Sequence, residues 1–405
     1  MKFNSKLGLL SLAMAGCASA QGLYYTGSEA QESMPLKWVV GANVTYDDNV
    51  APGGSQDGEE AVSANPYVGL SFINITPQTT WDVYARLGLI YYFDQSAEGV
   101  DDTYTQARAG VDFEHRFTER LRFASRNFIA YELEPDYSQG VSSTRQVGEY
   151  FYWQTDNSVG FRWSERLATY TGFSLTGLNY TDVDNNDRLT WTGYNQFRYQ
   201  LTPQTVLTAE YRYSQTSAND AASDATDQYI LGGIEHRFSP TTILIARVGA
   251  QLRDVDDGDS SSSPYLELAA NSKINEQFLI RAFARYGMEN YDTVQFVDGS
   301  GLSEFGERRT LRLGVSGEYS LSQALSLFGG VDYIPTSYEG GNTVATGTSV
   351  ADQDEEILNA YMGVSLKFTD YLYGTLSYNY TNSSSDLPNR DYNRNRISVG
   401  IRAEF

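Results

Sequence analysis

Residues 81–93 read Trp81-Asp82-Val83-Tyr84-Ala85-Arg86-Leu87-Gly88-Leu89-Ile90-Tyr91-Tyr92-Phe93. Every second side chain from Trp81 to Phe93 is apolar, whereas the side chains between them include Asp82 and Arg86. A period of two residues predicts a β-strand with one apolar and one polar face. The strand is also long, because strands of soluble proteins usually have about 5 to 6 residues.

The same alternation returns along the whole chain, and short polar turns separate the strands in pairs. Each turn follows a large apolar residue, and successive turns start 36 to 47 residues apart. The turns start at Thr76, Thr118, Ser164, Thr202, Ser239, Asn275, Ser322 and Thr369. Longer segments rich in Asp, Ser, Gly and Asn lie between these turns. Each period is therefore a strand, a long loop, a strand and a short turn, which predicts about eighteen strands, with sixteen as the alternative.

Long alternating strands with short turns at one end and long loops at the other are typical of an outer-membrane β-barrel. A sheet can cross a bilayer only as a closed barrel, because the lipid offers no partner to unpaired backbone groups. We therefore predict an all-β, antiparallel up-and-down barrel over residues 37–405, with periplasmic turns and acidic outer loops. Aromatic side chains near the long loops would form an outer girdle: Tyr91, Tyr92, Tyr211, Tyr213, Tyr378 and Tyr380. A soluble propeller also repeats every 40 to 45 residues, but each of its blades contains four short strands.

The start of the chain and its composition agree with export. Lys2 and Lys6 flank the start of a short apolar core at residues 7–15, and a small-x-small pattern ends at Ala20. This pattern predicts a signal peptide over residues 1–20 and a short periplasmic segment over residues 21–36. Acylation of Cys17 as a lipoprotein is the alternative. No apolar run reaches the roughly 20 residues of a membrane helix.

Charge and residue usage exclude several classes of function. The 405 residues carry 51 acidic and 29 basic side chains, a formal net charge of −22, which argues against nucleic acid as a partner. The two histidines, His115 and His236, share a face with lipid-facing Phe117 and Phe238, far from where a catalytic base would act. The sequence thus predicts no enzyme, no cofactor and no metal site.

The alternation turns nearly all the arginines toward the inside of the barrel. A charge on the lipid face at mid-bilayer would cost about 2 to 4 kcal/mol, so this segregation supports the barrel. The predicted pore-lining residues are Arg86, Arg108, Arg126, Arg162, Arg198, Arg212, Arg247, Arg281, Arg285, Arg312, Glu210 and Glu267. Two interpretations stay open: a wet channel that prefers anionic or sugar-like solutes, or a ladder of salt bridges that only braces the wall.

The two ends of the barrel resemble known outer-membrane proteins. Val399, Ile401, Ala403 and the terminal Phe405 share one face of the last strand, which resembles the assembly signal of these proteins. The block Tyr46-Asp47-Asp48-Asn49-Val50 at the end of the first strand resembles the β-barrel porin 2 family of Gram-negative bacteria. The resemblance implies location in the outer membrane, with its lipids, lipopolysaccharide and barrel-assembly machinery as partners.

The leading functional hypothesis is passive passage of small hydrophilic solutes. The alternatives are a component of exopolysaccharide export, with polysaccharide-export proteins as partners, and a structural or adhesive barrel without transport. Assembly into a homo-oligomer is also open.

Overall fold

A computed structural model of the protein describes residues 20–21, 24–25, 33–50, 59–93, 102–133, 149–181, 187–218, 223–256, 260–290 and 293–405. The predicted signal peptide up to residue 19, including Cys17, lies outside these residues. In the described part of the chain, no helix is long and apolar enough to cross a bilayer.

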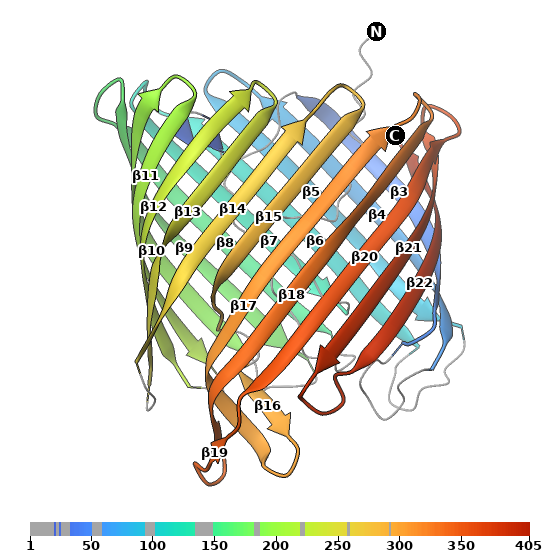
Figure 1. The fold of residues 1–405 in the computed structure, drawn as a ribbon. Coiled ribbons are helices and arrows are strands. Elements are labelled where there is room, and N and C mark those ends of the chain that lie inside the picture. The colour runs from blue at the N-terminus through green and yellow to red at the C-terminus, as the bar shows by residue number, and fades with distance from the viewer. Residues whose placement is uncertain are drawn as a thin grey trace.

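The strands form one closed antiparallel barrel of eighteen long strands, as predicted (Figure 1). Their order follows the chain, and β22 pairs with β3 to close the sheet. The first barrel strand begins at Met34, three residues before the expected start.

The barrel strands of the first half are β3 (Met34–Asp47), β4 (Ala61–Ile75), β5 (Thr79–Tyr92), β6 (Thr103–Arg116), β7 (Leu121–Glu132), β8 (Tyr150–Arg162), β9 (Leu167–Tyr180), β10 (Arg188–Thr202) and β11 (Thr205–Ala218). Those of the second half are β12 (Ala225–Ser239), β13 (Thr242–Val255), β14 (Ser261–Lys273), β15 (Phe278–Met288), β17 (Gly301–Ser320), β18 (Leu325–Thr343), β20 (Gln353–Lys367), β21 (Leu372–Ser385) and β22 (Tyr392–Glu404). Four short strands complete the set: β1 (Ala20–Gln21), β2 (Tyr24–Tyr25), β16 (Val294–Val297) and β19 (Ser349–Val350).

All eight short turns lie where the sequence predicts them. They connect β4 to β5, β6 to β7, β8 to β9, β10 to β11, β12 to β13, β14 to β15, β17 to β18 and β20 to β21. Their first residues explain why the chain reverses there. The hydroxyl of Thr118, for example, accepts hydrogen bonds from the backbone N–H groups of Arg120 and Leu121. The same local bond forms at Thr76, Ser164, Asn275, Ser322 and Thr369. A side-chain oxygen that binds the backbone two or three residues ahead favours a tight turn.

The outer surface of the barrel is apolar, and aromatic side chains mark its short-turn end. Phe117, Trp163, Phe238 and Phe368 are each more than half exposed there. At the long-loop end, Tyr91 is exposed as the predicted girdle requires, but Tyr92 is not. Tyr92 is 5% exposed and packs edge-on against Tyr104 inside the barrel, so its place in the outer girdle is wrong. Its neighbour Tyr91 occupies the lipid face, and successive side chains of a strand point to opposite faces.

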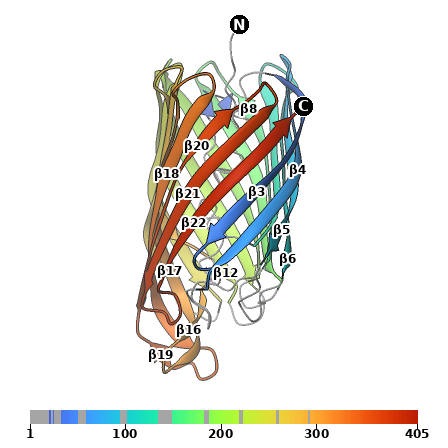
Figure 2. The same cartoon turned by 90° about the vertical axis from the view of Figure 1, so that its right-hand side faces the viewer.

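The barrel is flattened, since it is much broader in Figure 1 than in the view turned by 90° in Figure 2. Strands β17 and β18 have 20 and 19 residues and extend beyond the other strands at the long-loop end. There they pair with the short strands β16 and β19. The C-terminus lies at the opposite end, with the short turns.

Candidate functional site on the inner face of the barrel

Alternation along the strands places the predicted pore-lining residues on the inner face. Arg198 shows the contrast most sharply, because it is fully buried between Phe197 and Tyr199, which are 53% and 42% exposed on the outside. Inside the barrel most of these charged residues fall into three groups: an ionic network on β10–β14, a cluster around Glu289, and a cavity beside Arg86.

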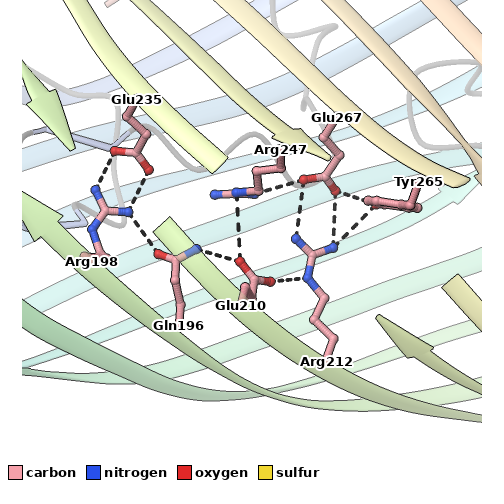
Figure 3. Close-up of polar contacts among 8 residues, drawn as sticks. All are labelled: Gln196, Arg198, Glu210, Arg212, Glu235, Arg247, Tyr265 and Glu267. Atoms are coloured by element: carbon pink, nitrogen blue, oxygen red, sulfur yellow. Dashed lines mark hydrogen bonds and ion pairs between the residues drawn. The ribbon is translucent and has the colours of Figure 1, made fainter. Parts of the chain in front are cut away.

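The ionic network joins five of the predicted residues (Figure 3). Arg198 of β10 binds Glu235 of β12 through two parallel hydrogen bonds of 2.6 and 2.5 Å. Arg212 of β11 binds Glu210 of its own strand and Glu267 of β14, the latter at 3.2 and 3.3 Å. These bidentate contacts fix the guanidinium groups geometrically as well as electrostatically.

Two further residues connect the parts of this network. Arg247 donates to Glu267 at 3.0 Å and lies 3.9 Å from Glu210. Gln196 accepts from Arg198 at 2.9 Å and donates to Glu210 at 2.6 Å. On this part of the wall the arginines are therefore paired with carboxylates, as the salt-bridge interpretation requires.

The second group surrounds a carboxylate that sequence reasoning missed. Glu289 follows β15 and accepts hydrogen bonds from Arg285 at 2.6 Å, Arg308 at 3.1 Å and Arg312 at 2.7 and 2.8 Å. It reads as part of an acidic outer loop in the sequence. Extending the alternation of Arg285 and Gly287 by two residues would have placed it inside.

Residues near Glu289 also contact strands that are distant in the sequence. Asn290 donates to Thr216 of β11 at 2.7 Å and to Asp227 of β12 at 2.9 Å. Farther along, Gln295 of β16 accepts from Arg390, in the loop between β21 and β22, at 2.8 Å. These contacts join parts of the chain that are distant in the sequence.

The remaining predicted arginines lie apart from these groups. Arg162 approaches Glu119 at 4.0 Å at the short-turn end, where Glu119 is 94% exposed. Arg126 faces Asp156 across β7 and β8, and Arg281 faces Ser316 across β15 and β17. The structure does not bring these three together.

The third group lines a cavity of about 290 Å³ on the inner face of β22 and β3–β7. Arg86, Arg108 and Arg396 contribute its basic side chains, and Asp47 and Glu132 its acidic ones. The rest of the lining is mainly amides and hydroxyls: Asn43, Thr45, Ser63, Asn65, Gln106 and Ser398, with Ile90, Tyr92 and Ala107. The cavity spans the seam where the barrel closes, so residues from both ends of the chain meet in it.

The Tyr46–Val50 block fastens this seam. The carboxylate of Asp47 accepts three hydrogen bonds of 2.5 to 3.1 Å from Arg394 of β22. Asp48 accepts from the backbone and side-chain amides of Asn395, both at 2.6 Å. Asn49 donates to the carbonyl oxygen of Asn393 at 3.1 Å. Three consecutive side chains thus tie the first strand to the last.

The C-terminal residues complete the seam at its other end. Val399, Ile401 and Phe405 are 58%, 52% and 70% exposed on the outer face, and Ala403 shares their side of the strand. The backbone N–H of Phe405 donates to the carbonyl oxygen of Trp38 at 2.8 Å, and the N–H of Trp38 donates back at 3.0 Å. Their role as an assembly signal remains a prediction.

No family model and no curated protein matches the chain. Solved structures that it resembles include OccAB4 from Acinetobacter baumannii, with 13% identity, a TM-score of 0.44, and coverage of 92% of this chain and 99% of that one. The outer membrane protein opdK from Pseudomonas aeruginosa has 12% identity and a TM-score of 0.45, and the match covers 91% of this chain and 99% of that one. A BenF-like porin from Pseudomonas fluorescens Pf-5 has 10% identity and a TM-score of 0.47, and the match covers 93% of this chain and 100% of that one.

At this level of similarity, the class of the protein rests on its own geometry. A closed antiparallel sheet that is apolar outside and charged inside defines a transmembrane β-barrel of the bacterial outer-membrane type. The predicted resemblance to outer-membrane barrels is confirmed at the level of architecture, and the β-barrel porin 2 family itself is not identified.

Proposed function

We propose that the protein is a porin-like channel for passive passage of small hydrophilic solutes across the outer membrane. The observation that carries the proposal is the cavity beside Arg86, which is lined mainly by charged and amide or hydroxyl side chains inside the closed barrel. A cavity with a polar lining is filled by water. A barrel with a purely structural role does not need such a water-filled cavity, whereas a channel for hydrophilic solutes does.

Two parts of the barrel wall have different roles. On β10–β14, the charged side chains form buried ion pairs that stabilise the wall. Arg198, Glu235 and Glu210 are all less than 10% exposed. The cavity side of the barrel is open to water and provides the path for solutes. The salt-bridge interpretation therefore applies to β10–β14, and the channel interpretation applies to the strands around the cavity.

Stepwise conductance of the folded protein in a planar lipid bilayer tests this function. A folded barrel that carries no current would overturn it and favour a barrel without transport. A barrel that conducts only after a polysaccharide-export protein is added would also overturn passive passage and would favour a role in export.

We further propose that the short turns and both ends of the mature chain face the periplasm. The difference in length between the short turns and the long loops supports this orientation, since outer-membrane barrels have short periplasmic turns and long external loops.

An inserted peptide epitope tests the orientation. Between Ala345 and Thr346, at the tip of the β18–β19 hairpin, the epitope should bind antibody on intact cells. Between Pro240 and Thr241, in a short turn, it should bind only after the outer membrane is opened. The reverse pattern would show that the barrel is inserted the other way.

A further inference from the structure

We propose that the cavity on the inner face of β22 and β3–β7 binds a small organic anion that carries hydroxyl groups, and that Arg86 binds its carboxylate. The proposal rests on the channel function for the route of the solute. The site itself can be tested on the folded protein without any measurement of transport.

The electrostatics of Arg86 are unusual for this wall. In the register of β5 and β6 it lies directly opposite Arg108. Like charges directly opposite each other destabilise a sheet. Arg108 is compensated, because its Nε lies 3.0 Å from Oε1 of Glu132. Arg86 forms no ion pair among the described residues; its Nη2 donates to the neutral side chain of Asn65 at 3.0 Å.

The same chain shows how a carboxylate resolves such a pair. Arg285 and Arg312 also lie directly opposite each other, on β15 and β17. Glu289 bridges them, at 2.6 Å from Arg285 and 2.7 Å from Arg312. In the pair of Arg86 and Arg108, the carboxylate of Glu132 forms an ion pair with Arg108 only. A solute carboxylate next to Arg86 would supply the missing negative charge.

Arg86 is held in position before a solute arrives. Its Cζ lies 3.8 Å from the centre of the Tyr67 ring, a cation–π contact. The Tyr67 ring packs over Gly41, where a Cβ atom would come within 2.5 Å of the ring. None of the Arg86 nitrogen atoms is buried without a partner, so its remaining N–H groups face the cavity that it lines. A guanidinium group fixed in this way presents the planar fork that suits a carboxylate.

The rest of the lining indicates the other groups of the ligand. Both acidic side chains are already engaged: Asp47 by Arg394, and Glu132 by Arg108 and Gln106. The cavity therefore offers a basic group together with amides and hydroxyls, which suit a polyhydroxylated acid. Its volume of about 290 Å³ is at the lower end of ligand pockets, which fits a solute as small as a single sugar acid.

Calorimetric titration of the folded, detergent-solubilised protein with gluconate tests the site, with glucose as the neutral ligand, at constant salt concentration. Gluconate should bind and glucose should bind at least about tenfold more weakly, because hydrogen bonds to a charged group are the stronger ones. Arg86→Gln should weaken gluconate binding by a similar factor. Arg237→Gln is the matched control, since it removes an inward arginine near the short-turn end and should leave binding unchanged.

A second variant tests the same site with Arg86 in place. Asn65→Asp puts a carboxylate next to Arg86 and should abolish gluconate binding by occupying the guanidinium internally. The Arg86→Gln barrel should remain folded, with an unchanged or higher unfolding temperature on heat-modifiable gels, because the repulsion from Arg108 is removed.

Equal affinity of gluconate for the wild type and both variants, or equal affinity of the wild type for gluconate and glucose, would overturn the site. The channel function fails separately. Gluconate binding without conductance would leave the site standing and remove the channel, and conductance without gluconate binding would do the reverse.

Discussion

Glu289 explains how the inner wall accommodates closely spaced arginines. Burial alone would raise the pKa of its carboxyl group, but the guanidinium groups of Arg312, Arg285 and Arg308 outweigh burial and hold the pKa well below its usual range. A carboxylate whose pKa is lowered by folding stabilises the folded state at pH values above its unfolded pKa, about 4.3 for Glu. This stabilisation is lost as the pH falls from there toward the lowered pKa.

Glu289→Gln should therefore lower the free energy of unfolding by about 3 to 5 kcal/mol at pH 7, because the buried guanidinium groups of Arg308 and Arg312, and the partly exposed one of Arg285, lose their counter-charge. The difference from the wild type should shrink as the pH falls below about 4, where the Glu289 carboxylate of the unfolded wild-type chain begins to be protonated while that of the folded barrel stays ionised. Urea unfolding followed by Trp fluorescence at several pH values measures both effects. Glu119→Gln, at an exposed position, should change little. A difference that stays constant down to the lowest pH would contradict the ionic role of Glu289.

The seam between β3 and β22 is the contact that closes the sheet. Asp47→Asn should lower the unfolding temperature on heat-modifiable gels and the yield of folded barrel, because it leaves Arg394 buried without its carboxylate. Asp352→Asn, in the exposed segment before β20, serves as the control and should behave like the wild type. Normal folding of the Asp47 variant would show that backbone pairing alone closes the barrel.

Strands and turns could be predicted from the sequence because each is determined locally. The alternation of residues 81–93 is a property of one strand, and a turn residue such as Thr118 binds backbone only two or three residues away. Tyr92 was misplaced because two adjacent tyrosines at a strand end look equally suited to an aromatic girdle. Only the parity of the strand separates them, and it places Tyr92 inside.

The partners of the inward charges could not be predicted from the sequence. Parity gives the face of Arg86 and of Arg198, but the register between strands decides which carboxylates they meet. Arg198 meets Glu235 two strands away, whereas Arg86 meets Arg108. The cavity depends in addition on barrel closure, which brings Asn43 and Ser398 to one site from opposite ends of the chain.

The reversal potential of the folded protein in a planar bilayer, measured across a salt gradient, tests whether the barrel is a water-filled channel whose path passes the charge of Arg86. The wild type should conduct with a weak preference for anions, because the acidic outer loops oppose the basic interior, and Arg86→Gln should shift the reversal potential toward cations. A folded wild-type barrel without conductance would contradict the channel function, and a reversal potential that Arg86→Gln leaves unchanged would contradict a solute path past Arg86.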